Sequence, residues 1–396
     1  MKQQLLLLIV LLSNQLNAQP FQLGHTTITL IDSARNNRSI ATEIYYPADI
    51  AGNNVPMTTL TNATFPVLSF GHGFVMSWDA YQNIWEAIVP EGFIIAFPKT
   101  EGGASPSHSN FGQDLEFVLS SLQVLNMNAT SLFYNRIDSM NCVMGHSMGG
   151  GAALLAAKNS SIIKSVAVLA PAETNPSAIQ ASIGIGIPSL IFAGGNDCVT
   201  PPSTNQVPIY DSLQSNCKTY ISIQGGSHCQ MAESNILCSL GEATCTPQPT
   251  ISRVQQHSVI NRYLIPWLNF QLKNNCKSGA QIDSMISTDA DILFQKNCTL
   301  CSATFVTDYS TSLAVDVFPN PFIDKLHIQF NKLNDSREIK VDIIQLDGRI
   351  LFSETFFPGT SHEQITLSLN KNLPKGIYFL HATTGSHQSV KKLIKQ

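Results

Sequence analysis

A serine flanked by glycines carries the strongest chemical signal of this sequence. Gly145, Ser147 and Gly149 form a Gly-x-Ser-x-Gly pattern directly after an apolar run at residues 139–144. This spacing is typical of a nucleophile elbow, a tight turn between a strand and a helix that lifts the serine hydroxyl above a sheet. Glycines are needed on both sides because Cβ atoms would collide where strand and helix cross. The small residues at 148–158 fit the helix, so we predict that Ser147 is a nucleophile.

A nucleophilic serine needs a base, and the base needs an acid that orients it. In enzymes with this elbow, the acid and then the histidine follow the serine along the chain. Asp197 comes after an apolar run at 187–193, and His228 comes after another at 218–223. Both therefore lie just beyond the carboxyl ends of expected strands, where open α/β sheets place their chemistry. We predict a catalytic triad of Ser147, Asp197 and His228 that transfers acyl groups through an acyl-enzyme.

An acyl-transfer site also needs hydrogen-bond donors for the oxyanion of the tetrahedral intermediate. An apolar run at 65–70 leads into the glycine-flanked loop 71–74, which is where the first donor of such sites usually lies. We assign the donors to the backbone N–H groups of Phe74 and Met148, the latter being the residue after the nucleophile. The side chains of Phe74 and His146 are candidates for substrate contacts. His72 is expected to form local hydrogen bonds, and residues 77–89, which hold Trp78 and Trp85, to form a core helix.

Through these motifs, residues 21–270 resemble a known protein family. The chain resembles an α/β hydrolase of the cutinase and polyester (PET) hydrolase kind in its elbow and in four further stretches, which are 188–192 (PSLIF), 196–197 (ND), 208–212 (PIYDS) and 225–228 (GGSH). The resemblance implies an α/β-hydrolase fold, in which helices flank a mostly parallel twisted sheet. It implies the same nucleophile, acid and base, and it puts Phe74 at the aromatic position of the oxyanion loop. The mechanism requires no metal and no organic cofactor.

The sequence indicates the type of reaction more clearly than the class of substrate. Relatives that grip aromatic polyesters carry a Trp after the strand that follows the nucleophile helix, and residues 171–176 contain none. Three alternatives stay open: a cutinase-like or PET hydrolase-like polyesterase, a lipid or small-ester esterase of the acetylhydrolase or dienelactone-hydrolase kind, and a non-catalytic surface-binding protein on a hydrolase fold. The segment 235–256 follows His228 and is placed to overhang the pocket.

The composition and the amino end indicate an exported protein. The 396 residues are 43% hydrophobic and 13% charged, with a net charge of −4 and no basic patch, so no nucleic-acid partner is expected. The basic and apolar residues 1–18 are typical of a secretory signal peptide that is cleaved after Ala18. This apolar stretch is too short to span a bilayer, and no later segment qualifies. We expect a monomer that acts on an ester, either small or polymeric.

The other end of the chain changes character. After a catalytic domain at 19–275 and a linker at 276–312, residues 313–396 alternate apolar and polar side chains with turn signals, which predicts a small all-β sandwich. This part resembles the C-terminal sorting domain of the type IX (Por) secretion system, through the stretches 318–321 (FPNP), 347–349 (DGR), 373–379 (LPKGIYF) and 390–394 (VKKLI). The resemblance implies that the secretion machinery is a partner, and that the protein is secreted or held at the cell surface.

The nine cysteines point to disulfides, with at least one thiol left over. Cys198 follows the predicted acid and Cys229 follows the predicted base, so we expect them to be paired. Cys238 and Cys245 flank a short loop and are expected to pair locally. Cys142 is expected to be a buried free thiol. A disulfide is also favoured over a zinc or redox role for the remaining pattern, Cys298-x-x-Cys301.

Overall fold

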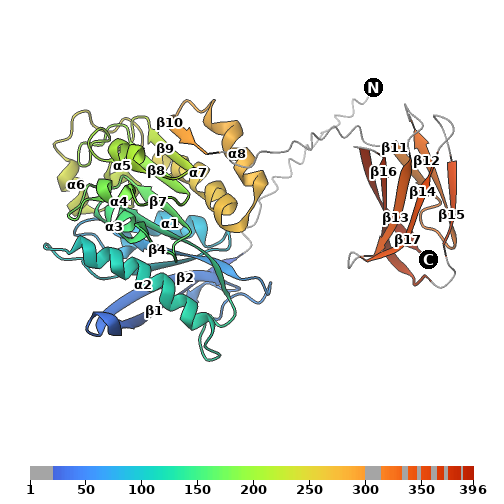
Figure 1. Ribbon diagram of the computed structural model, residues 1–396, viewed down its shortest axis with the longest axis horizontal. Coiled ribbons are helices and arrows are strands. Elements are labelled where there is room, and N and C mark those ends of the chain that lie inside the picture. Colours follow the sequence, from blue (N-terminus) through green and yellow to red (C-terminus); the bar gives the residue numbers. More distant parts are fainter. Residues whose placement is uncertain are drawn as a thin grey trace, which may run out of the picture. The chain divides into compact units, whose positions relative to one another are not determined.

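The computed structural model describes residues 21–298, 314–331, 338–345, 349–357, 364–369, 373–384 and 387–396. The predicted signal peptide at 1–18 lies outside these residues. The chain divides into two compact units, Met1–Cys301 and Ser302–Gln396, whose elements are labelled in Figure 1.

A ten-stranded sheet forms the centre of the described part of the first unit, in the order β10-β9-β8-β7-β6-β4-β5-β2-β1-β3 (Figure 1). Its strands are β1 (Gln22–Asp32), β2 (Arg38–Ala48), β3 (Gly52–Asn53), β4 (Phe65–Gly71), β5 (Ile94–Pro98), β6 (Ile137–His146), β7 (Ser165–Leu169), β8 (Ser189–Gly194), β9 (Lys218–Ile223) and β10 (Ile292–Asn297). Strands β4 to β9 run parallel to their neighbours among themselves, while β1, β2 and β10 join antiparallel. The predicted mostly parallel sheet is confirmed.

Helices cover both faces of this sheet, which explains why its central strands are continuous apolar runs rather than alternating ones. The helices are α1 (Gln82–Ile88), α2 (His108–Asn126), α3 (Met148–Ala157), α4 (Ala178–Ser182), α5 (Gln206–Ser212), α6 (Ile236–Glu242), α7 (Arg253–Lys273) and α8 (Cys276–Ile286). Successive residues of β6 point to opposite faces of the sheet. Val143 packs in the core with α2 to α5, and Met144 packs in the core with α1, α7 and α8. The result is the predicted α/β-hydrolase fold.

The order of strands creates the crevice where the site lies. From β4 the chain moves to β5 on one side and then crosses to β6 on the other, so β4 is the point where the winding reverses. Ligands of open α/β sheets bind beyond the carboxyl ends of the strands at such a point. Gly71, the last residue of β4, and Gly145, the residue before the end of β6, are direct partners in the sheet. The expected oxyanion loop and the expected nucleophile therefore leave the sheet side by side.

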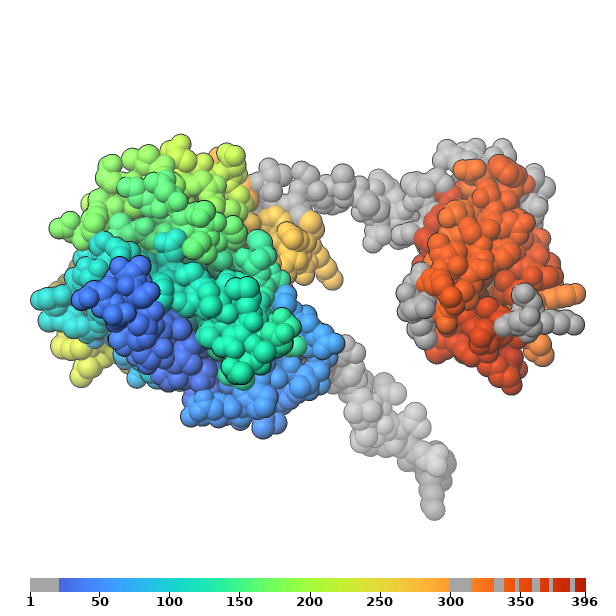
Figure 2. Space-filling view, turned by 60° about the horizontal axis from the view of Figure 1, so that its bottom comes forward, coloured from blue at the N-terminus to red at the C-terminus, as the bar shows by residue number. Residues whose placement is uncertain are grey.

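Ion pairs tie the amino-terminal edge of the sheet to α2. The guanidinium groups of Arg35 and Arg38 each lie 2.7 Å from the buried carboxylate of Asp114. Figure 2 shows this edge, with the first strands in dark blue against the teal α2. The pairing joins the short turn between β1 and β2 to the helix that follows β5.

The prediction of a linker at 276–312 is wrong for residues 276–298. α8 packs against α7, and β10 pairs antiparallel with the full length of β9. A disulfide between Cys217 and Cys298 fastens the end of β10 to the start of β9. Residues 276–298 therefore belong to the first unit, because they complete its sheet and cover one face of it.

The predicted disulfide pairs are also wrong. Cys198 bonds to Cys245 and Cys229 bonds to Cys238, so the expected Cys198–Cys229 and Cys238–Cys245 bridges do not form. The reason is the segment made of the short helix α6 and the turn after it: Cys238 on α6 bonds to the loop of the base, and Cys245 in the turn bonds to the loop of the acid. Cys298 pairs with Cys217 rather than within its own Cys-x-x-Cys pattern. The expectation of a buried free thiol at Cys142 is confirmed, and burial raises the pKa of this thiol to about 12.

Two antiparallel sheets make up the described part of the second unit, as predicted for an all-β sandwich. One sheet has the order β11 (Ala314–Phe318), β12 (Lys325–Asn331), β15 (Gln364–Ser368), and the other the order β14 (Ile350–Phe356), β13 (Ile339–Gln345), β16 (Gly376–Thr384), β17 (His387–Lys395). Their buried residues, such as Ile328 and Ile343, share one core. Asp347 and Gly348, from the DGR stretch that carries the resemblance, lie outside the described residues. In the part of the chain that the structure covers, no helix has the length and apolar character needed to cross a membrane.

The Cys217–Cys298 bridge yields a prediction about stability. Replacing both residues in the double variant Cys217→Ser, Cys298→Ser opens a loop with a sequence separation of 81. We expect the free energy of unfolding of the first unit to fall by about 4 kcal/mol, since the unfolded chain gains conformational entropy. Denaturant unfolding measures this change. An unchanged midpoint would contradict the view that β10 is part of this unit, while ester turnover of the folded variant should stay at the wild-type level.

Candidate functional site

Ser147 sits in the strained turn that its sequence pattern predicts. Its backbone has φ 54° and ψ −122°, in the left-handed half of φ space that is unfavourable for a residue with a side chain. Three hydrogen bonds hold it there: its N–H donates to the carbonyl of Leu169 at 3.0 Å, and its carbonyl accepts from the N–H groups of Gly151 and Ala172 at 3.0 and 2.9 Å. Strain that is held this firmly is typical of functional sites. The turn raises the hydroxyl at the amino end of α3.

Glycines make the close crossing of this turn possible. A Cβ atom on Gly149, in the first turn of α3, would overlap the carbonyl oxygen of Gly71 at the end of β4. A Cβ atom on Gly145, at the end of β6, would overlap the carbonyl of Gly149. Any side chain at either position would push α3 away from the sheet. The glycines of the elbow therefore set how near the nucleophile lies to the oxyanion loop.

The predicted acid and base are brought together from the ends of neighbouring strands. Asp197 follows β8 and His228 follows β9, and the Nδ1 atom of His228 lies 2.8 Å from Oδ2 of Asp197. Both residues are buried, with exposed fractions of 5% and 2%. The other carboxylate oxygen of Asp197 accepts hydrogen bonds from the N–H groups of Val199 and Thr200. This arrangement fixes the carboxylate, holds Nδ1 toward it, and leaves Nε2 of His228 free to serve a nucleophile.

Thr200 is a member of this site that the sequence reasoning missed. Its buried hydroxyl donates to Oδ2 of Asp197 at 2.9 Å and lies 3.0 Å from Nδ1 of His228. The amide nitrogen of Gln206 in turn donates to this hydroxyl at 3.1 Å. The hydroxyl therefore completes the shell around the acid and the base. The available signal was the Asp-x-x-Thr spacing, in which an aspartate accepts from the backbone three residues later.

Two residues from the start of α7 hold the loop of the base and were missed as well. Gln256 is fully buried, and its side-chain amide bonds to both the N–H and the carbonyl of Ser227, at 2.9 and 2.8 Å. Arg253 donates from its guanidinium to the carbonyls of Cys229 and Ala232. These contacts clamp the residues on both sides of His228. No local pattern reveals them, because the partners are more than twenty positions apart in the sequence.

The expected oxyanion loop is fixed through the carbonyl of Gly73. This carbonyl lies 2.9 Å from Nδ1 of His72 and accepts the N–H of Met76 at 3.1 Å. Because a trans peptide is planar, fixing this carbonyl also fixes the direction of the N–H of Phe74 on the other side of the same bond. The second ring nitrogen of His72 lies 2.9 Å from the carbonyl of Thr100, so this histidine bonds locally as expected. Phe74 is 49% exposed, and its contact with substrate stays a prediction.

The second expected oxyanion donor is the N–H of Met148. Met148 is the first residue of α3, where backbone N–H groups have no partner within the helix. The partial positive charge at a helix amino end adds to the attraction for an anion.

The expectation that His146 contacts substrate is contradicted by its burial. The side chain is fully buried, and its ring lies between Tyr81 and His228. Nδ1 of His146 is 3.0 Å from the hydroxyl of Tyr81, and the ring centroids of His146 and His228 are 4.7 Å apart. Burial, aided by the nearby His228, places the pKa of His146 well below its ordinary value. His146 is therefore a neutral residue packed behind His228, the predicted base.

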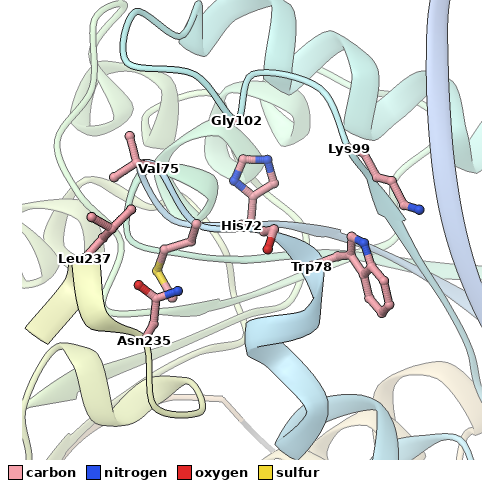
Figure 3. Close-up of a pocket in the computed structure, with 9 residues that line it drawn as sticks. His72, Val75, Trp78, Lys99, Gly102, Asn235 and Leu237 are labelled. Carbon is pink, nitrogen blue, oxygen red and sulfur yellow. The ribbon is translucent and has the colours of Figure 1, made fainter.

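An open pocket of about 350 Å³ lies beside the oxyanion loop (Figure 3). Its lining comes from three places: the loop before α1, the segment after β5 and the start of α6, which contribute Val75, Met76, Trp78, Lys99, Asn235 and Leu237. The segment 235–256 thus borders a pocket, although the triad residues are not among its lining. Trp78 faces this pocket, whereas Trp85 is buried in the core against Tyr45. The helix expected at 77–89 is present as a short 3₁₀ turn, Trp78–Tyr81, followed by α1.

Comparison with known proteins agrees with this architecture. A family model described as PET hydrolase-like matches residues 15–245, which is more than half of the chain. A second model, described as a secretion system C-terminal sorting domain, matches residues 316–396. These two matches cover the two units separately.

Among curated proteins, the chain is similar to Cutinase est1 of Thermobifida alba, with 27% identity over 47% of this chain and 56% of that protein. It is similar to Cutinase 2 of Thermobifida cellulosilytica, with 26% identity over 53% of this chain and 79% of that protein. It is also similar to a bis(hydroxyethyl) terephthalate hydrolase of Streptomyces coelicolor, with 26% identity over 48% of this chain and 56% of that protein. The chain thus spans little more than half the length of two of these three relatives.

Thr200 gives a direct test of the hydrogen-bond shell. The variant Thr200→Val keeps the volume but removes the hydroxyl that bonds to Asp197 and lies beside His228. We expect kcat for a soluble ester to fall about ten- to a hundredfold, because one buried hydrogen bond to a charged group contributes roughly 1.5–3 kcal/mol. The matched variant Thr200→Ser, which keeps the hydroxyl, should retain most of the activity. Wild-type activity in Thr200→Val, or a loss in Thr200→Ser as large as the loss in Thr200→Val, would contradict this role of the hydroxyl.

Proposed function

The chain belongs to the PET hydrolase-like family, and on this premise we propose that it is a secreted serine carboxylic-ester hydrolase that acts through Ser147, His228 and Asp197. The single observation that carries the proposal is the gathering of three features at the carboxyl ends of adjacent strands. These are a strained serine at the amino end of α3, an imidazole 2.8 Å from a buried carboxylate, and the loop before Phe74, which hydrogen bonds hold at Gly73.

The reaction begins when Nε2 of His228 takes the proton of the Ser147 hydroxyl as the oxygen attacks the ester carbonyl. Asp197 accepts the hydrogen bond from Nδ1 of His228 and so stabilises the imidazolium that forms. The carbonyl oxygen becomes an oxyanion, which the N–H groups of Phe74 and Met148 bind. His228 then gives its proton to the departing alcohol, and an acyl-enzyme remains on Ser147. Water then attacks the acyl-enzyme ester, with His228 again acting first as base and then as acid. The carboxylic acid product leaves and Ser147 is free again.

The substrate that we propose is a hydrophobic ester whose chain lies across an open site, such as a polyester. Phe74 presents an exposed aromatic ring beside the expected oxyanion donor, and the pocket next to it is open and lined by Trp78 and Met76. α6 has no buried residue and exposes Ile236 and Leu240 at 77% and 67%. An open, apolar surround suits a polymer better than a deep, narrow pocket would.

A second candidate substrate is a small diester. It is favoured by the similarity to a protein named bis(hydroxyethyl) terephthalate hydrolase, and by the absence of a Trp in the segment after β7, where relatives that grip aromatic polyesters carry one.

The second unit indicates where the enzyme works. Its match to a secretion system C-terminal sorting domain indicates export by the type IX system to the cell surface or the surroundings. An exported site is consistent with the disulfides between described residues of the first unit, Cys198–Cys245, Cys217–Cys298 and Cys229–Cys238, because disulfides form and persist in oxidising surroundings. The enzyme then meets esters outside the cell.

The nucleophile is tested with the variant Ser147→Ala. We expect kcat for a short-chain nitrophenyl ester to fall by about 10⁴-fold or more, because no other group can form the acyl-enzyme. Stopped-flow measurement of the nitrophenol burst should show one equivalent for the wild type and none for the variant. Wild-type turnover in Ser147→Ala would overturn the assignment, and the absence of any ester hydrolysis in the wild type would favour a non-catalytic binding protein.

The substrate class is tested by comparing an amorphous polyester film with soluble esters. We expect soluble acids and alcohols to be released from the film, and the variant Ile236→Ser, Leu240→Ser on α6 to lower this release several-fold while leaving soluble ester turnover unchanged. The matched control is Leu60→Ser, which changes a side chain that is 71% exposed in the segment before β4. Turnover of soluble diesters with no release from the film would instead select the small-ester function.

A further inference from the structure

A buried tyrosine connects the two halves of the proposed site. Tyr81 ends the 3₁₀ turn before α1 and is fully buried between Phe70 and Met76. Its hydroxyl accepts the N–H of Gly73 at 2.7 Å and lies 3.0 Å from Nδ1 of His146. Gly73 directly precedes Phe74 in the oxyanion loop, and His146 directly precedes Ser147. The hydroxyl of Tyr81 thus contacts both segments of the proposed site. It bonds to the backbone of Gly73 in the oxyanion loop and to the side chain of His146 beside Ser147.

The direction of these hydrogen bonds follows from the burial of both side chains. Burial raises the pKa of Tyr81 above its usual value, so the phenol keeps its proton and can donate it. Burial also lowers the pKa of His146, so its ring is neutral and one of its nitrogens can accept. The alternative acceptor, the sulfur of Met76 at 3.5 Å, is a weak one. The hydroxyl therefore donates to Nδ1 of His146, and the proton of this histidine is on Nε2.

Gly73 is held on both sides as a result. Its N–H is bound by Tyr81, and its carbonyl is bound by His72 and Met76. The peptide between Gly73 and Phe74 carries the first expected oxyanion donor, so rotation of Gly73 would turn that N–H away from the substrate. Loss of the Tyr81 hydroxyl removes the anchor on the N–H of Gly73, so this residue can rotate and turn the following peptide with it.

Through His146, the contacts of Tyr81 also reach the proposed base, His228. The ring of His146 packs against the ring of His228, with centroids 4.7 Å apart and planes inclined by 43°. A His146 ring that has lost its partner at Nδ1 can rotate, and rotation would disturb the packing against His228. The contact with the base is therefore indirect, through the shape and orientation of His146.

We propose that Tyr81 is a positioning residue that couples the oxyanion loop to the catalytic histidine through Gly73 and His146. The inference rests on the proposed function, since it concerns the geometry of that same site. Tyr81 touches no substrate in this arrangement. Its ring fills a core that a phenylalanine would fill equally well, so only the hydroxyl group is needed for this role.

The test is the variant Tyr81→Phe, measured as kcat and KM for a soluble nitrophenyl ester. We expect kcat to fall about tenfold while KM changes less than about twofold, because the loss acts on transition-state binding. The loss stays below the roughly hundredfold or greater effect of removing an oxyanion donor, since the donor is still present but less well held. Affinity for a boronic acid, which mimics the tetrahedral intermediate, should fall with kcat, and affinity for the product acid should not.

The matched control is Tyr46→Phe. Tyr46 is also fully buried and donates its hydroxyl to a backbone carbonyl, that of Val55, at 2.7 Å, but it lies in the core on the other face of the sheet. This variant should lower the unfolding midpoint comparably and leave kcat unchanged. A second variant, Gly73→Ala, places a methyl group 2.8 Å from the sulfur of Met76 and 3.3 Å from both the hydroxyl of Tyr81 and Nδ1 of His146. The flexible Met76 side chain can move aside, and the crowding of the hydroxyl should lower kcat in the same way.

Wild-type kcat and boronic acid affinity in Tyr81→Phe would overturn the proposal. Equal kcat losses in Tyr81→Phe and Tyr46→Phe would overturn it as well, because stability alone would then explain them. Should Tyr81→Phe fail to fold, a wild-type kcat in Gly73→Ala would refute the coupling and a loss of kcat with unchanged KM would support it. The variant Ser147→Ala, measured alongside, separates failure of the Tyr81 proposal from failure of the proposed function. Activity retained in Ser147→Ala refutes the proposed function, independently of the result for Tyr81→Phe.

Discussion

The close contact of α3 with the ends of β4 and β6 is the constraint on which the rest of the site depends. Gly71, Gly145 and Gly149 meet where any Cβ atom would collide with backbone, so the amino end of α3 sits directly on the sheet. This contact places the strained Ser147 and the N–H of Met148 next to the loop that carries Phe74. Because β4 is also the strand where the winding of the sheet reverses, the crevice opens at the same point. The position of the nucleophile is thus a property of backbone packing, and the side chains around it act on a geometry that is already set.

The acid and the base are held by a different means, namely buried hydrogen bonds and disulfides. Asp197 and His228 lie in loops beyond β8 and β9, and loops have no regular ladder of hydrogen bonds to fix them. Thr200, Gln206 and Gln256 supply that support from elements on either side. The residue after the acid and the residue after the base are each joined by a disulfide to α6 or the turn that follows it, so one short segment fastens both loops. The larger of the two loops so closed contributes about 4 kcal/mol in the chain-entropy model.

Those parts of the molecule that depend on local sequence could be predicted from it. The elbow at Ser147, the apolar strands before Asp197 and His228, and the alternating pattern of the second unit all have a periodicity or a turn that is visible in a short window. The disulfides, the role of Thr200 and the burial of His146 could not be predicted with the same reasoning. Each depends on which distant segments meet: Cys229 pairs with Cys238 because α6 folds back beside it, and His146 is buried because Tyr81 covers it. The strand β10 was not predicted because only its first residue, Ile292, is buried, so it lacks both the apolar run and the alternation of a core strand.

The most direct measurement is mass spectrometry of the enzyme quenched during turnover of a slowly deacylating ester. The mechanism requires a covalent acyl group on the hydroxyl of Ser147, carried by the peptide that spans the end of β6 and the start of α3. We predict one acyl group per chain on that peptide and none on the remaining serines, lost on further incubation with water. Turnover without any adduct, or an adduct on another residue, would contradict the assignment of Ser147 as the nucleophile.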